Sequence, residues 1–91
     1  MHKRIECIVI GKVQGVFFRD FVKTKADASG LSGFVKNNPD GTVKVVAEGA
    51  EEKLKDFLAL LKSGTEYSKV ENIDVKWHSP TGEFSGFEIK Q

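Results

Sequence analysis

Two kinds of hydrophobic spacing alternate along this chain, and their order limits its fold more than any other feature. From Ile5 to Ile10 apolar side chains recur at alternate positions, as in a β-strand with one buried face. From Asp20 to Ser29, and again after Gly49, they recur every three or four positions, as on a helix with one apolar stripe. The pattern therefore predicts strands interleaved with helices that each bury one face.

Turn residues complete the expected order of elements. Asn38-Pro39-Asp40-Gly41 predicts a tight hairpin, because proline presets the turn and glycine permits a positive φ. Strand, helix, strand, strand, helix, strand and a short terminal strand indicate an α+β fold, the ferredoxin-like α/β sandwich, with two helices on one face of a mainly antiparallel sheet. We expect one domain over residues 1–91, with strands at 5–10, 33–38, 42–48, 73–77 and 87–89.

Composition excludes several classes of protein. Fourteen basic and thirteen acidic residues leave a net charge of +1 without a basic run, so we expect no nucleic-acid partner. Cys7 is the only cysteine, which excludes an intrachain disulfide and a cysteine-rich zinc site. No apolar run is long enough for a membrane span or a secretory signal. We expect a cytoplasmic monomer that does not associate with membranes.

The two histidines do not predict a metal site. His2 and His78 have no cysteine, carboxylate or second histidine at ligand spacing. We therefore expect neither a metal nor another cofactor.

The segment Gly11–Arg19 has the composition of an anion-binding loop. Glycines at 11 and 15 let backbone amides turn toward a common point, and Arg19 lies where a helix begins. Its guanidinium can hold two oxygens of one phosphoryl group. These residues alone leave open an ordinary strand-to-helix turn with a solvated arginine.

A second segment makes the pattern more specific. V-x-G-x-V-Q-G-V-x-F-R at Val9–Arg19, followed by G-F-V-K-N-x-x-x-G-x-V-x-x-x-x-x-G at Gly33–Gly49, resembles both signatures of the acylphosphatase family. The resemblance covers most of the chain.

It implies a hydrolase that converts acyl phosphates to a carboxylate and inorganic phosphate without a metal. By this resemblance Arg19 matches the phosphate-binding arginine, and Asn37 the asparagine that positions water. The resemblance also implies that phosphate contacts the backbone amides of the loop that ends in Arg19: Gln14, Gly15, Val16, Phe17 and Phe18.

Phe17 departs from the glycine found at this position in most bacterial members. Because a bulky residue avoids positive φ, we expect the loop to reach its shape without a positive φ at this position. Phe18 is expected in the core, whereas Phe17 is equally compatible with the core and with the mouth of the site.

The chemistry of an acyl phosphate agrees with these residues. Its leaving group is a carboxylate with a pKa of about 4 to 5, which departs without a proton, so no general acid is needed. A neutral amide such as that of Asn37 can orient water, although on its own Asn37 is equally consistent with a hairpin turn residue. The alternative function is a non-catalytic ferredoxin-like module that binds phosphate-bearing ligands or RNA.

Overall fold

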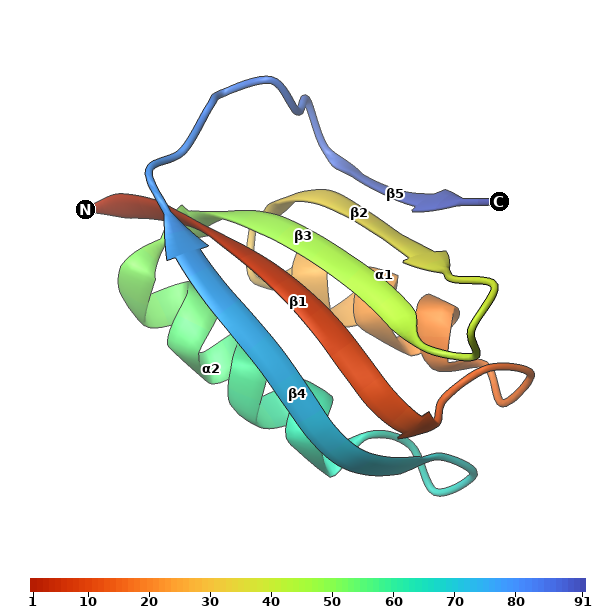
Figure 1. Ribbon diagram of the computed structural model, residues 1–91. Coiled ribbons are helices and arrows are strands. Elements are labelled where there is room, and N and C mark those ends of the chain that lie inside the picture. Colours follow the sequence, from red (N-terminus) through yellow and green to blue (C-terminus); the bar gives the residue numbers. More distant parts are fainter.

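The computed structural model describes residues 1–91. Its elements follow the predicted order: β1 (His2–Lys12), α1 (Phe18–Ala28), β2 (Ser32–Asn37), β3 (Val43–Ala50), α2 (Glu51–Ser63), β4 (Lys69–His78) and β5 (Phe87–Lys90) (Figure 1). The largest differences from the predicted bounds are in β1 and β4, which are both longer. α1 begins at Phe18, so Arg19 belongs to its first turn.

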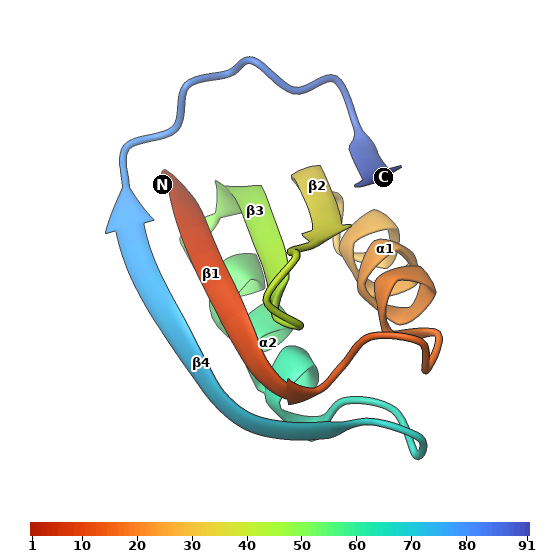
Figure 2. The ribbon, with the colours of Figure 1, turned by 45° about the vertical axis from the view of Figure 1, so that its right-hand side comes forward.

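The five strands form one sheet in the order β4-β1-β3-β2-β5. All neighbours are antiparallel except β2 and β5, which run parallel. Figures 1 and 2 show both helices on the same face of this sheet. The predicted ferredoxin-like sandwich is therefore confirmed, with β3 as the middle strand.

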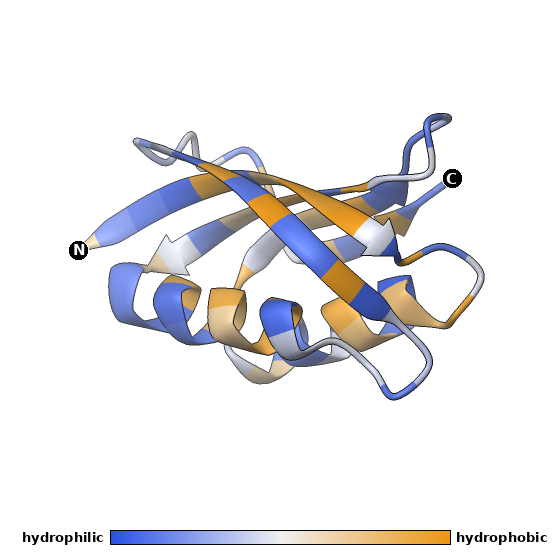
Figure 3. Cartoon of the chain, turned by 60° about the horizontal axis from the view of Figure 1, so that its bottom comes forward, coloured by the Kyte–Doolittle hydropathy of each residue, from blue (hydrophilic) through white to orange (hydrophobic).

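The core lies between the sheet and the two helices. Alternate residues of β1 and the apolar stripes of α1 and α2 are buried there, and Figure 3 shows apolar positions alternating with polar ones along the strands and both helices. Burial raises the pKa of the Cys7 thiol to about 12, so this cysteine is a packing residue. The fully buried positions contributed by these three elements are Ile5, Cys7, Val9, Phe18, Val22, Ala26, Leu54, Phe57 and Leu61.

A buried carboxylate holds the segment that connects β4 to β5. Glu48 of β3 is only 5% exposed. Its oxygens accept hydrogen bonds from Arg4 Nη1 at 2.8 Å and from the backbone amides of Thr81 and Gly82 at 2.9 and 3.0 Å. Burial alone raises the pKa of Glu48, but these bonds outweigh it and lower the pKa to about 2.

The same connection covers part of the sheet face opposite the helices. The ring of Phe84 packs edge-on against Phe34 of β2, with 6.0 Å between ring centroids. Lys90 Nζ lies 4.4 Å from the Phe34 ring centroid.

Neither helix is long and apolar enough to cross a membrane.

Candidate active site

The loop that joins β1 to α1 takes its shape from two residues with positive φ. Gly15 has φ 71° and Phe17 has φ 60° with ψ 21°, which is the left-handed region. No side chain caps the start of α1. Because the first N–H groups of a helix have no partner within it, this end of α1 can bind an anion.

The conformation of Phe17 contradicts the sequence-based expectation. Phe17 adopts the positive φ that a bulky residue was expected to avoid, at a cost of roughly 1–2 kcal/mol. It lies two residues after the positive-φ Gly15 and directly before the buried Phe18, so both left-handed residues fall in the short connection between β1 and α1. Phe17 is 74% exposed and so does not pack in the core, whereas Phe18 is buried as expected.

Gly11 does not help to form the anion-binding loop, although its place in the motif suggested that it would. It lies where the β1–β4 register shifts, with φ 136°. A Cβ atom here would lie 2.1 Å from the backbone oxygen of Lys69. This glycine therefore permits close approach of β1 and β4, and it does not line the cavity beside the loop.

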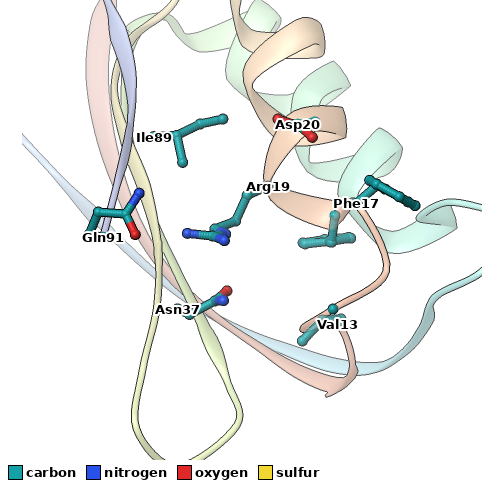
Figure 4. Close-up of a pocket in the computed structure, with 9 residues that line it drawn as sticks. Val13, Phe17, Arg19, Asp20, Asn37, Ile89 and Gln91 are labelled. Atoms are coloured by element: carbon teal, nitrogen blue, oxygen red, sulfur yellow. The ribbon is translucent and has the colours of Figure 1, made fainter.

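That cavity, which we call the β1–α1 hollow, has a volume of about 460 Å³ (Figure 4). Arg19 reaches it from the first turn of α1, and Asn37 from the last residue of β2. Of the residues predicted to bind phosphate, Gln14 and Val16 do not line it. The nine lining residues are Val13, Gly15, Phe17, Phe18, Arg19, Asp20, Asn37, Ile89 and Gln91.

The polar groups of Arg19 and Asn37 are largely uncommitted within the protein. Arg19 Nη1 donates one long hydrogen bond, 3.4 Å, to the backbone oxygen of Lys90. Asn37 Oδ1 is buried without a protein hydrogen-bond partner. A buried, unpaired acceptor costs about 1–3 kcal/mol, which stability alone does not explain. Arg19 can therefore contact a ligand in the hollow, and Asn37 lines the hollow with an amide whose oxygen no protein group satisfies.

The side chain of Gln14 makes contacts that the sequence analysis did not predict. Its Nε2 donates hydrogen bonds to the backbone oxygens of Asn38 at 2.8 Å and Thr42 at 2.9 Å. Asn38 and Thr42 also bond to each other across the hairpin turn. The side chain of Gln14 thus joins the β1–α1 loop to the β2–β3 hairpin, next to Asn37.

The sequence analysis did not identify the contribution of β5. Because β5 pairs with β2 in parallel, Lys36 and Lys90 are register partners. The residues on either side of Lys90, Ile89 and Gln91, therefore reach the hollow beside Asn37. No local signal indicates this, since it depends on which strand β5 pairs with.

No group of three or more His, Cys, Asp or Glu side chains is arranged to hold a metal ion. The hollow contains one carboxylate, that of the exposed Asp20 at its edge. Its positive charge comes from Arg19 and the start of α1.

Comparison with known proteins agrees with this geometry. The sequence model of the acylphosphatase family matches residues 5–89. The chain belongs to the acylphosphatase family. It is a hydrolase that acts on acyl phosphates and releases inorganic phosphate, as the resemblance implied.

Individual acylphosphatases are similar over almost the whole chain. One from Dehalococcoides mccartyi is 45% identical over 87 residues, which are 94% of this chain and 96% of the relative. One from Bacillus licheniformis is 48% identical over 81 residues, 89% of this chain and 87% of the relative. The crystal structure of acylphosphatase from Bacillus subtilis has a TM-score of 0.95 at 40% identity and covers 98% of this chain and 99% of that one.

Proposed function

We propose that the β1–α1 hollow is where this acylphosphatase hydrolyses acyl phosphates, by in-line attack of water on phosphorus. The observation that carries this proposal is that Arg19 and Asn37 line one hollow at the uncapped start of α1. The hollow thus combines a fixed positive charge, a helix N-terminus and a neutral amide. Phosphoryl transfer requires mainly positioning and charge stabilisation, which these groups supply.

Arg19 and the backbone amides of the loop residues that line the hollow, Gly15, Phe17 and Phe18, bind the phosphoryl group. The transition state of phosphoryl transfer is loose, and its negative charge is spread over three equatorial oxygens. The guanidinium of Arg19 contacts two of these oxygens, and the backbone amides contact the third. Because Arg19 is anchored only by its long bond to Lys90, its fork is free to align with the phosphate.

Asn37 orients the attacking water. Its Oδ1 is buried and has no protein partner. Once the side chain turns this oxygen toward the hollow, it accepts a hydrogen bond from water, which directs a lone pair of the water oxygen at phosphorus. As the new P–O bond forms and the bond to the acyl oxygen breaks, the water proton passes to a phosphate oxygen. The acyl oxygen departs as a carboxylate and needs no proton.

We also propose that residues 1–91 act as one catalytic domain and as a cytoplasmic monomer, without a metal, another cofactor or a nucleic-acid partner. The leaving group supports metal independence because its departure needs no Lewis acid. No observation favours the alternative of an RNA-binding module. The single aromatic residue on the inner strands, Phe34, packs against Phe84 instead of presenting a free stacking surface.

The experiment is to assay the purified chain on acetyl phosphate and on ethyl phosphate, with and without EDTA. We expect hydrolysis of acetyl phosphate only, unchanged by EDTA, and competitive inhibition by inorganic phosphate. Comparable rates on both substrates would reveal a general acid that the mechanism lacks. Activity that disappears in EDTA and returns with added metal would refute the metal-free mechanism.

A further inference from the structure

Phe17 combines two unfavourable features. Its backbone is in the left-handed region, and its ring is 74% exposed. Neither a turn preference nor core packing accounts for a phenylalanine at such a position. Residues held in strained conformations cluster at functional sites, so the surroundings of the Phe17 ring are a candidate for a functional site.

The ring of Phe17 belongs to a second hollow on the other side of the same loop. This Tyr67 hollow has a volume of about 450 Å³ and is lined by Lys12, Gly15, Val16, Phe17, Glu66 and Tyr67. Gly15 and Phe17 line both hollows, so the two adjoin at this loop.

Tyr67 presents a second exposed aromatic ring, 61% accessible, on a turn with a defined shape. Thr65 and Ser68 hold this turn: the Thr65 amide donates to Ser68 Oγ at 2.8 Å, and the Ser68 amide donates to the Thr65 oxygen at 3.2 Å. The Tyr67 amide also donates to Thr65 Oγ1 at 3.3 Å. The backbone that carries Tyr67 is therefore fixed beside the loop.

The geometry of in-line displacement relates the Tyr67 hollow to the β1–α1 hollow. In an in-line displacement the attacking water and the leaving group lie on opposite sides of phosphorus. If Asn37 holds the water, the acyl group leaves from the side farther from Asn37. Figure 4 shows Phe17 across the β1–α1 hollow from Asn37, with its ring pointing away from Arg19.

We propose that Phe17 and Tyr67 form an acyl-binding site that selects acyl phosphates with aromatic or bulky apolar acyl groups. The proposal rests on the proposed function, in which the phosphoryl group occupies the β1–α1 hollow. Two exposed aromatic rings offer stacking and apolar contact to such a group. Lys12 and Glu66, the charged residues of the Tyr67 hollow, carry opposite charges and so provide no net attraction for a charged acyl group.

The test is the ratio of kcat/KM for benzoyl phosphate to kcat/KM for acetyl phosphate. A ratio is required because the Phe17 amide belongs to the proposed phosphate cradle, so substitution there changes both rates. The difference in intrinsic reactivity of the two substrates is the same for every variant and cancels when variants are compared. Phe17→Gly removes the ring and keeps the backbone conformation accessible.

We expect Phe17→Gly to lower this ratio about tenfold, the usual discrimination from one apolar contact in a pocket. Tyr67→Ser should lower it about threefold, whereas Tyr67→Phe, which keeps the ring, should retain the parental ratio. Thermal unfolding of each variant checks that it is folded. A ratio that stays within about twofold of the parent in both Phe17→Gly and Tyr67→Ser would overturn the acyl-binding site. If the parent hydrolyses neither substrate, the proposed function fails and the inference fails with it.

Discussion

Arg19 and Asn37 approach one hollow from different elements, and the proposed mechanism gives them different tasks. Arg19 contacts the phosphate both before and during the reaction. Asn37 acts through the attacking water. Substitution of each residue should therefore change different kinetic constants.

Arg19→Ala is expected to weaken competitive inhibition by inorganic phosphate and to abolish most hydrolysis of benzoyl phosphate. Asn37→Ala should lower kcat by roughly 10²- to 10³-fold and leave phosphate inhibition nearly intact, because one positioning group is lost. Asn37→Ala should not destabilise the fold by more than about 1 kcal/mol, since it removes an acceptor that has no protein partner. Near-normal kcat in Asn37→Ala, or parental phosphate affinity in Arg19→Ala, would contradict these roles.

Phe17 offers a test of backbone strain that is independent of catalysis. Phe17→Gly should raise the free energy of unfolding by about 1 kcal/mol, because glycine adopts φ 60° without the steric cost of a Cβ atom. Phe17→Ala is the matched control, since it also removes the ring but keeps the Cβ atom. Urea unfolding of both variants measures the difference, and equal stability of the two would show that the left-handed backbone is not strained.

The β1–α1 loop and the β2–β3 hairpin are separate elements that Gln14 joins. The loop supplies the proposed phosphate amides, and the hairpin begins directly after Asn37. In the proposed mechanism, the relative position of these two elements therefore sets the distance from phosphate to attacking water. Small displacements of this kind have large effects on rate.

Gln14→Ala should lower kcat about tenfold, with a smaller change in phosphate inhibition, because the hairpin is no longer held against the loop. It should also lower the free energy of unfolding by about 1–3 kcal/mol, since the Asn38 and Thr42 oxygens lose their side-chain donor. Asn38→Ala is the control, because it removes only the side-chain bond to Thr42 Oγ1 and leaves the Gln14 bonds in place. Equal losses of kcat in the two variants would show that the Gln14 bonds between loop and hairpin do not control kcat.

For the whole molecule, stability depends on the connection between β4 and β5, which lie at opposite edges of the sheet. Residues 79–86 join these edges and are held by Glu48, whose partners are Arg4, Thr81 and Gly82. Glu6 and Glu83 also bind Arg4, and the hydrogen bond from Arg4 lowers the pKa of Glu6.

This network predicts how stability varies with pH. The pKa of Glu48 falls from an ordinary value of 4.5 to about 2 on folding, so its stabilisation is complete above pH 4.5. It is lost as the pH decreases through about 2, because protonation of the carboxylate breaks the charged hydrogen bonds.

Glu48→Gln should lower the free energy of unfolding by about 3 kcal/mol at pH 7 and flatten its dependence on pH in the acid range. Glu71→Gln, at an exposed site on β4, is the control and should leave the acid dependence of the parent unchanged. The measurement is urea unfolding at several pH values between 2 and 7. If the free energy of unfolding of Glu48→Gln falls as steeply at low pH as that of the parent, the acid dependence arises from other carboxylates.

Most elements could be predicted from the sequence because their signals are local. The stripe of Phe18, Val22 and Ala26 predicts a helix whichever sheet it covers, and the stripe is buried as expected. The alternation in β1 likewise predicts the buried face of a strand. The two motifs led to Arg19 and Asn37 because each motif is continuous in sequence, although their roles remain proposals.

The sequence by itself determined the order of the elements, their buried faces and the family, since periodicity, turn residues and motifs act over a few neighbouring positions. Tertiary structure alone decided that β5 brings Ile89 and Gln91 to the hollow, that Gln14 holds the hairpin, and that Glu48 holds residues 79–86. Each of these contacts joins residues far apart in sequence, so each depends on strand pairing and sheet order. The positive φ of Phe17 has the same origin, because β1 and α1 fix both ends of the loop and the residue between them must adopt the conformation that connects them.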